Sequence, residues 1–248
     1  MILLKSPQEL AKMEMANRIV AEILVGVKER VQPGIETREL DELAEEMCRQ
    51  HRVEPAFKGY RGYPRSLCVS VNEEIVHGIP GARKIKVGDL VSLDFGVKYQ
   101  GYYGDAAVTV AVGEVDSRAR KLLETTETAL YAGISQAKVG QRLSDISHAV
   151  QGVVEGAKFG VIREFVGHGI GRSLHEDPQI PNFGPPGRGP LLQAGMTLAI
   201  EPMTSMGAWQ VRILKDGWTA VTQDGSYAAH FEHTVAVTEN GPLILSRL

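Results

Sequence analysis

The sequence predicts an α+β fold, on three observations. Four segments carry apolar residues at helical spacing, each beginning near a serine or threonine that can cap a helix. Other segments alternate apolar and polar residues, as strands with one buried face do. The order histidine, acid, acid occurs twice along the chain. We therefore expect one domain, 1–248, made of two similar halves, roughly 1–113 and 114–248.

The expected helices of the first half lie near the N-terminus. Residues 6–9, Ser-Pro-Gln-Glu, offer a capping serine, a proline suited to the first helical position and a glutamate that completes a capping box. An apolar stripe follows, and Pro33 with Gly34 ends the helix. Thr37 is expected to cap a second helix, whose inward face is Leu40, Leu43, Ala44 and Met47.

The second half repeats this pattern, with Ser117 and Ser144 as the expected caps of two further helices. Residues 176–190 contain five prolines and three glycines, which predicts an irregular surface loop. Residues 55–66, rich in Gly, Pro and Tyr, are also expected to form a loop. Residues 207–231 are expected to form a strand meander.

Four acidic residues lie on strand patterns that are otherwise apolar: Asp94, Asp105, Glu201 and Glu232. Each acid shares its strand face with small or polar residues, while Val, Leu, Ile or Phe side chains occupy the opposite face. One alternative is that the acids lie on solvated faces by chance. The recurrence of the pattern in four strands favours a common site.

The two halves also share the spacing of their motifs. In the first half, a His-Gly-Ile triplet beginning at His77 is followed by a glycine and, six residues after it, by Asp94. In the second half, the triplet beginning at His168 is followed by a glycine and, six residues after it, by Glu201. A second acid then leads into a valine-rich strand in each half. The repeat suggests a pseudo-twofold arrangement with the acids near the axis.

Four clustered carboxylates require cations between them. Two unit charges about 4 Å apart repel by roughly 4 kcal/mol at an effective dielectric constant near 20, so the acids would otherwise protonate or separate. Two divalent ions balance this charge. An oxygen-rich ligand set with one imidazole, that of His168, suits Mn, Fe, Co or Zn. Paired ions of this kind activate a water molecule for hydrolysis.

Composition narrows the class of protein. Charged residues are 23% and hydrophobic residues 43% of the 248, as is usual for a soluble globular protein. A net charge of −3 gives no reason to expect nucleic-acid binding. The two cysteines, Cys48 and Cys68, lack a metal-type spacing and favour a reducing compartment. With no signal sequence and no long apolar run, we expect a cytoplasmic protein without membrane contact.

The chain resembles the type I methionine aminopeptidases of metallopeptidase family M24 over nearly its whole length. The stretches that carry the resemblance are 59–64 (GYRGYP), 72–80 (NEEIVHGIP), 88–94 (GDLVSLD), 104–105 (GD), 167–171 (GHGIG), 175–178 (HEDP), 200–202 (IEP) and 232–234 (EHT). Each is weak alone, but together they are highly specific. The resemblance implies the pita-bread fold, a curved antiparallel sheet backed by helices, with pseudo-twofold halves.

The resemblance also implies a role for each ligand. Asp94 would chelate one metal ion, His168 and Glu201 would bind the other, and Asp105 and Glu232 would bridge the pair. A metal-bound water would attack the carbonyl group after the initiator methionine, with Glu201 as the proton shuttle.

Two further histidines are given roles by the resemblance. His175 would hydrogen-bond the scissile carbonyl and stabilise the oxyanion, and His77 would contact the peptide near the leaving amide. Alternatively, each is a satisfied buried histidine in a turn. The methionine pocket would be lined by residues that are otherwise plain core: Phe57, Tyr60, Tyr63, Cys68, Leu174 and Trp218.

Two positions depart from the family pattern. Arg61 stands where many relatives carry His, and Phe57 where many carry Cys. A guanidinium at position 61 could pair with the substrate backbone or with a nearby acid, and Phe57 would narrow the pocket entrance. His51, His148 and His230 match no motif and are expected to be surface or structural residues.

The expected activity is hydrolytic removal of the initiator methionine from nascent proteins and peptides whose second residue is small. Only 31 positions separate Glu201 from Glu232, which favours type I over the type II branch with its helical insertion. We expect a monomer with transient ribosome contact. The alternatives are a proline-specific aminopeptidase or prolidase, which usually carries a further N-terminal domain, and a metal-free peptide-binding scaffold.

Overall fold

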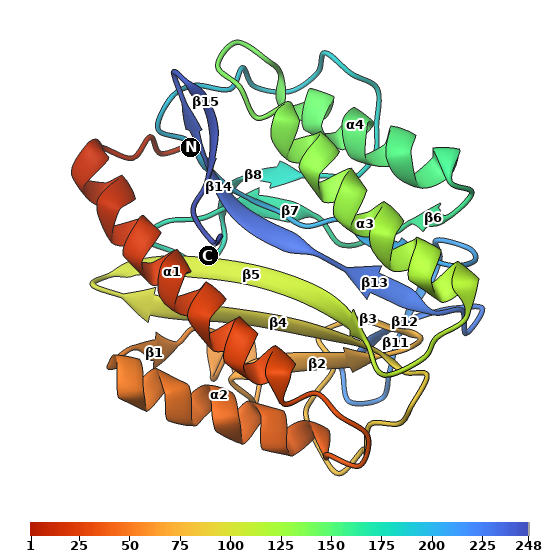
Figure 1. Ribbon diagram of the computed structural model, residues 1–248. Helices are drawn as coiled ribbons and strands as arrows, with labels where there is room; N and C mark the ends of the chain where they lie inside the picture. Colours follow the sequence, from red (N-terminus) through yellow and green to blue (C-terminus); the bar gives the residue numbers. More distant parts are fainter. Residues whose placement is uncertain (248) are drawn as a thin grey trace.

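The computed structural model describes residues 1–247 and shows a curved antiparallel sheet with helices packed on one face (Figure 1). The nine strands run in the order β1-β4-β5-β14-β9-β7-β8, with β2 also paired to β4 and β15 to β14. These strands are β1 (Glu54–Pro55), β2 (Leu67–Val71), β4 (Leu90–Tyr99), β5 (Tyr102–Ala111), β7 (Gly167–Gly169), β8 (Glu176–Ile180), β9 (Thr197–Ile200), β14 (Glu232–Thr238) and β15 (Gly241–Ile244).

Two small three-stranded sheets lie beside the main one. The first joins β13 (Ala228–His230), β10 (Met203–Ser205) and β6 (Gly160–Val161). The second joins β11 (Val211–Ile213), β12 (Ala220–Thr222) and β3 (Glu74–Val76). The expected meander at 207–231 is therefore present, but its strands are divided between these two sheets.

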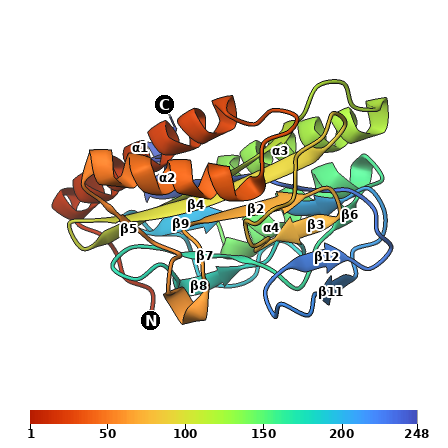
Figure 2. The ribbon, with the colours of Figure 1, turned by 90° about the horizontal axis from the view of Figure 1, so that it is seen from below.

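The helices cover one face of the main sheet in two pairs. α1 (Pro7–Glu29) and α2 (Thr37–His51) lie over the strands of the first half, and α3 (Ser117–Ser135) and α4 (Leu143–Gly156) over those of the second (Figure 1). Seen from below, α1 and α2 lie along one side of the molecule, and β8 and β11 lie along the opposite side (Figure 2). Within residues 1–247, no helix has the length and apolar character that a membrane span needs.

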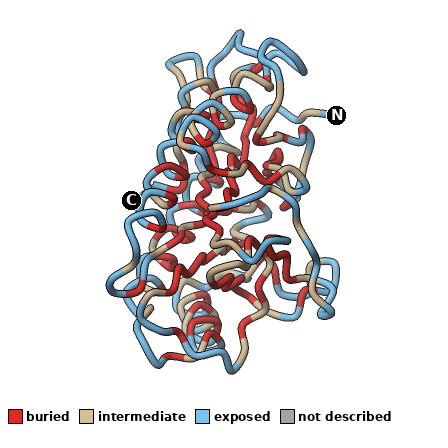
Figure 3. The backbone as a smooth tube through the Cα atoms, turned by 90° about the vertical axis from the view of Figure 1, so that its right-hand side faces the viewer, coloured by how far each residue is buried: buried red, intermediate tan, exposed pale blue. Residues whose placement is uncertain are grey.

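Each half has its own apolar core between helices and sheet. In the first half, Val20 of α1 and Leu40 of α2 belong to one buried cluster with Phe95 of β4. In the second half, Ile146 of α4 and Val235 of β14 belong to another. Buried backbone runs through the centre of the molecule and exposed segments surround it (Figure 3). The halves join where β5 pairs with β14.

At Gly104, the backbone of α1 lies against the sheet. A β-carbon at this position would come within 2.8 Å of the Asn17 backbone nitrogen, so a side chain here would force the helix away. The Asn17 side chain donates to the Met13 carbonyl (2.8 Å) and accepts from the Asp105 backbone N–H (3.2 Å). Helix α1 therefore fixes the backbone at Asp105.

The capping predictions are correct for one helix and wrong by one or two residues for the others. Ser6 and Glu9 form the predicted capping box of α1. The N-cap of α2 is Glu36, because the Thr37 hydroxyl instead bonds to Gly81. The N-cap of α3 is Asp116, whose carboxylate accepts from two backbone N–H groups. The N-cap of α4 is Arg142, and Ser144 instead accepts from the Arg188 backbone N–H.

The loop predicted at 176–190 begins as a strand. β8 (Glu176–Ile180) pairs with β7 at the edge of the main sheet. Proline is tolerated in an edge strand because the strand needs hydrogen bonds on one side only, and this explains Pro178. The segment 55–66 likewise contains the end of β1 and a short 3₁₀-helix, η1 (Tyr60–Gly62).

Candidate metal centre

Strand register brings two of the predicted acids into one cross-strand row. Cys68 lies opposite Asp94, Asp94 opposite Ala107, and Ala107 opposite Glu232. Opposite residues in antiparallel strands point to the same face of the sheet. Asp105 lies two residues before Ala107 and therefore shares this face.

A neighbouring row brings in the other two residues. His168 lies opposite Ala199, which in turn lies opposite Thr234, two residues after Glu232. Glu201 lies two residues after Ala199, just beyond the end of β9, so it points the same way. The face is the one turned away from the helices, because Leu93 and Phe95, on the opposite face, pack with α1 and α2.

The side-chain atoms are close enough to bind the same metal ions. His168 Nε2 lies 3.9 Å from Asp105 Oδ2 and 3.5 Å from Glu201 Oε1. One ligand atom each from Asp105, His168 and Glu232 lie within 4.8 Å of one another. His168 Nδ1 lies 2.9 Å from the Gly169 carbonyl oxygen. When Nδ1–H donates to this carbonyl, the Nε2 lone pair faces the acids, as it does in a metal-binding histidine.

Burial and mutual repulsion make it unfavourable for the four carboxylates to be ionised together without cations. Burial raises the pKa of Asp94 to about 7. Burial and neighbouring carboxylates raise the pKa values of Asp105, Glu201 and Glu232 well above their usual range. Burial lowers the pKa of His168 to about 4, so its imidazole is neutral at pH 7. Cations among the acids would offset the repulsion.

The unpaired atoms in the cluster fit divalent ions. Asp94 Oδ1, Asp105 Oδ1 and Glu232 Oε1 are buried and have no hydrogen-bond partner among residues 1–247. Buried polar atoms in native proteins normally have a partner, and an ion is one explanation when they do not. A set of carboxylate oxygens with one imidazole matches the preferences of first-row divalent metals. The residues present therefore fit a metal centre.

The cluster forms the floor of a pocket with an apolar wall. All six residues predicted to line a methionine pocket are among its lining residues: Phe57, Tyr60, Tyr63, Cys68, Leu174 and Trp218. Tyr63 is held by a hydrogen bond from its hydroxyl to the Gly78 carbonyl (2.9 Å). The Trp218 ring meets the Tyr63 ring edge-on, with 5.2 Å between centroids. The wall is thus both apolar and fixed.

His77 and His175 also line the pocket. His175 Nδ1 lies 2.9 Å from the Tyr60 hydroxyl, and its ring centroid lies 4.1 Å from that of His168. Burial, followed by nearby positive charge, lowers the pKa of His175 to about 3, and burial lowers that of His77 to about 4. Both imidazoles are therefore neutral at pH 7 and can each donate one hydrogen bond.

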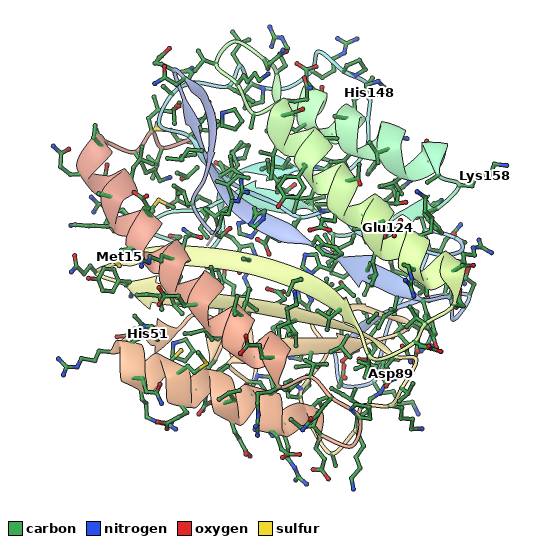
Figure 4. All side chains as sticks on the ribbon, in the orientation of Figure 1. Met15, His51, Asp89, Glu124, His148 and Lys158 are labelled. Atoms are coloured by element: carbon green, nitrogen blue, oxygen red, sulfur yellow. The ribbon has the colours of Figure 1, made fainter. Side chains whose placement is uncertain are left out.

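His230 is the residue near the site that the sequence prediction missed. It is fully buried, and its Nε2 lies 3.7 Å from Glu201 Oε2. Its position two residues before Glu232 is not a sufficient signal, because His230 belongs to β13 of a small sheet and Glu232 to β14 of the main sheet. By contrast, His51 and His148 lie on α2 and α4, the helices that cover the opposite face of the sheet, and His148 is exposed (Figure 4).

Comparison with known proteins gives a consistent relationship over the full chain. The sequence pattern of Metallopeptidase family M24 matches residues 11–239. Methionine aminopeptidase 1 of Bacillus subtilis is 54% identical over 248 residues, which cover 100% of both chains. The crystal structure of methionine aminopeptidase from Thermotoga maritima is 53% identical, covers 100% of both chains and gives a TM-score of 0.98.

A more distant likeness shows the fold alone. The prolidase from Pyrococcus horikoshii is 22% identical, with a TM-score of 0.80, and the match covers 98% of this chain but 63% of the prolidase. Together these neighbours confirm the predicted pita-bread fold. They do not favour the proline-specific alternative, because the full-length matches at high identity are methionine aminopeptidases.

Proposed function

The chain belongs to metallopeptidase family M24, and from this premise we propose that it is a metal-dependent methionyl aminopeptidase. It removes the N-terminal methionine of proteins and peptides, preferring a small second residue. One observation carries the proposal: five metal-type side chains share the floor of a pocket whose wall is apolar and aromatic. The full-length identity to methionine aminopeptidases supports the choice of substrate.

In this proposal, two divalent ions are held by Asp94, Asp105, His168, Glu201 and Glu232. Four carboxylates match the charge of two such ions, and the unpaired buried oxygens support their role as ligands. When bound, the ions activate water and polarise the substrate carbonyl group. Cobalt, manganese, iron and zinc all suit these donors.

Side chains of the protein carry out the remaining steps of peptide hydrolysis. Glu201 accepts the proton of the attacking water and passes it to the leaving amine. Support for this role comes from the position of its carboxylate, which lies between His168 (3.5 Å) and His230 (3.7 Å) at the pocket floor. General acid–base transfer by a positioned carboxylate is a common route to faster peptide hydrolysis.

His175 stabilises the oxyanion that develops on the scissile carbonyl. If Tyr60 donates its hydroxyl proton to Nδ1, the His175 Nε2–H is left to donate to the substrate oxygen. His77 contacts the peptide near the leaving amide. Its ring is held edge-on by Phe165 and Trp218, with centroids at 5.4 and 6.3 Å.

The methionine side chain occupies the apolar wall of the pocket. Tyr63, Trp218 and Phe57 present aromatic surface, with which a thioether makes favourable contacts. The free amine of the substrate lies at the acidic floor, which explains cleavage at the first peptide bond only. The substrates are N-terminal methionyl peptides and nascent chains. The protein acts as a monomer in the cytoplasm, and its contact with the ribosome is transient.

Reconstitution tests the proposal. Protein stripped of metal should be inactive against the peptide Met-Ala-Ser and should recover on titration with cobalt, manganese, iron or zinc. An X-Pro peptide, assayed in parallel, should be cleaved poorly. Cleavage of the X-Pro peptide in preference to Met-Ala-Ser would show a proline-specific enzyme instead. Binding without turnover of either peptide would show a scaffold.

A further inference from the structure

Arg61 presents a positive charge at the pocket that no acid of the described chain neutralises. It is exposed, and it lines the same pocket as the acid cluster. Within residues 1–247, no carboxylate lies within ion-pair distance of its guanidinium; the ion pairs include those of Arg65 with Asp41 and Arg172 with Glu9. Of the two pairings expected for Arg61, the one with a nearby acid is therefore absent from the part of the chain that the structure describes.

The backbone holds Arg61 in an unfavourable conformation. Its φ of 51° and ψ of 20° lie in the left-handed region, which costs free energy for a residue with a β-carbon. The turn is closed by hydrogen bonds from Gly59 N–H to the Tyr63 carbonyl (2.8 Å) and from Tyr63 N–H to the Tyr60 carbonyl (2.9 Å). Strain of this kind persists where the surroundings fix it, often at ligand sites.

The guanidinium is also positioned by an aromatic stack. Its central carbon lies 5.3 Å from the centroid of the Tyr60 ring. The Tyr60 ring in turn stacks on His175, with centroids 5.3 Å apart and planes 15° from parallel. The charge of Arg61 is thus held on the same rim of the pocket as His175. η1, which carries Arg61, projects from the face of the sheet away from α1 and α2 (Figure 2).

The path of the substrate leads past this charge. On the proposed function, which this inference extends, the first residue has its amine at the acidic floor and its side chain against the apolar wall. The residues after the scissile bond must leave through the open side of the pocket, where Arg61 is exposed. A planar guanidinium binds carboxylates through paired hydrogen bonds.

We propose that Arg61 binds a carboxylate of the substrate beyond the scissile bond, so that the enzyme favours peptides with a negative charge near their third residue. The charge has two sources, an Asp or Glu side chain and the C-terminal carboxylate of a short peptide. A free guanidinium, a fixed turn and the direction of the leaving chain together support this specificity.

The test compares peptides that differ only in this charge. Met-Ala-Asp-Leu-amide is compared with Met-Ala-Asn-Leu-amide for the side-chain source, and Met-Ala-Asn with Met-Ala-Asn-amide for the C-terminal source. The enzyme is loaded with one metal throughout. The wild-type protein should prefer the charged member of at least one pair by about three- to five-fold in kcat/KM, mostly through KM, as an exposed ion pair permits. The preference should decrease as ionic strength rises.

Two variants test whether the preference for charged peptides depends on Arg61. Arg61→Gln should reduce the ratio to about one, and this readout holds whatever the variant does to overall turnover, because both peptides of a pair are compared on the same protein. Arg172→Gln is the matched control, because Arg172 is also exposed but already paired with Glu9 at 3.0 Å. It should retain the wild-type ratio. An equal preference in the wild-type and Arg61→Gln proteins would overturn the inference.

A binding measurement separates this inference from the proposed function. Reduced-amide analogues of the Asp and Asn tetrapeptides cannot be hydrolysed, and their dissociation constants can be measured by calorimetry. The Asp analogue should bind about three- to five-fold more tightly to the wild-type protein and equally to Arg61→Gln. If no methionyl peptide is cleaved but this difference persists, the proposed function fails and the role of Arg61 stands. Equal binding of both analogues to the wild-type protein, together with equal hydrolysis of Met-Ala-Asn and Met-Ala-Asn-amide, would refute the role of Arg61.

Discussion

The two halves of the molecule share an architecture but contribute different groups to the centre. In each half, two helices precede the strands and a central strand meets its counterpart at the β5–β14 pairing. The first half brings Asp94 and Asp105 to the acid cluster. The second half brings His168, Glu201 and Glu232. The imidazole thus comes from one half only, although both halves carry the His-Gly-Ile triplet.

The difference originates in the backbone around the two histidines. His168 lies within β7, where pairing with β9 points its ring at the acids. His77 follows β3, outside any strand, with a left-handed φ of 62°. Its ring instead faces Phe165 and Trp218. A repeated sequence motif therefore fixes neither the local backbone nor the role of its side chain, because both depend on strand pairing.

The largest expected effect tests whether both halves are needed at the centre. Asp94→Ala from the first half and Glu232→Ala from the second should each reduce kcat/KM by about 10³-fold or more, because each leaves the cluster short of a ligand. Hydrolysis of Met-Ala-Ser at saturating manganese measures this. Ser92→Ala, on the same strand face as Asp94 but bonded to Thr109, is the matched control. Near-wild-type turnover of Asp94→Ala would remove Asp94 from the ligand set.

The next effect concerns a link between the start of the chain and the second half. Lys5 and Glu176 form an ion pair with side-chain exposures of 5% and 8%. Lys5→Met leaves a buried carboxylate without its cation, so we expect a loss of about 3 kcal/mol in the free energy of unfolding. Urea denaturation measures it. Lys28→Met, at an exposed lysine of α1, should change stability by less than about 0.5 kcal/mol. A small effect of Lys5→Met would show that Glu176 is satisfied by its two backbone donors, Arg172 and Ser173.

A third pair of variants separates the roles of the two triplet histidines. His168→Ala should weaken metal binding, whereas His77→Ala should leave it unchanged and reduce kcat/KM by about 10²-fold, as loss of a contact to the reacting peptide does. Calorimetric titration with manganese measures the first and peptide hydrolysis the second. If both variants lost metal equally, the two halves would be functionally alike at this position.

The smallest expected effect is a pH dependence at a surface contact between the halves. Glu9 of α1 accepts from Tyr102 and from Arg172, which belongs to the second half. The Ser6 backbone N–H, then Tyr102 and Arg172, lower the pKa of Glu9 from 4.5 to about 2. Because the folded pKa is depressed, the contact contributes stability above pH 4.5, which is lost as the pH falls towards 2. Glu9→Gln should flatten this part of the curve of stability against pH, and an unchanged slope would show that other carboxylates dominate it.

Much of the site follows from local sequence pattern. Alternation placed Asp94 and Asp105 on the polar faces of their strands, and the structure puts them on one face of one sheet. The pocket residues came from the family resemblance, and all of them line the pocket. Their roles as ligands and substrate contacts remain predictions for the experiments above.

What the sequence could not supply depends on partners distant in the chain. The Thr37 hydroxyl bonds to Gly81, so a residue that looks like a cap is used in a tertiary contact. Pro178 suggested a loop, but β8 is an edge strand that tolerates it. The burial of His230 follows from pairing between β13 and β10, which no local pattern specifies.

The pairing of β5 with β14 also has a consequence for how the protein matures. It joins Ala107 to Glu232, so the strand that completes the cluster is synthesised long after the strand with which it pairs. Contacts between segments so far apart form late in folding, since the connecting chain must first be ordered. We therefore expect metal ions to bind only after this strand has paired. A half-synthesised chain carries only Asp94 and Asp105 of the five proposed ligands.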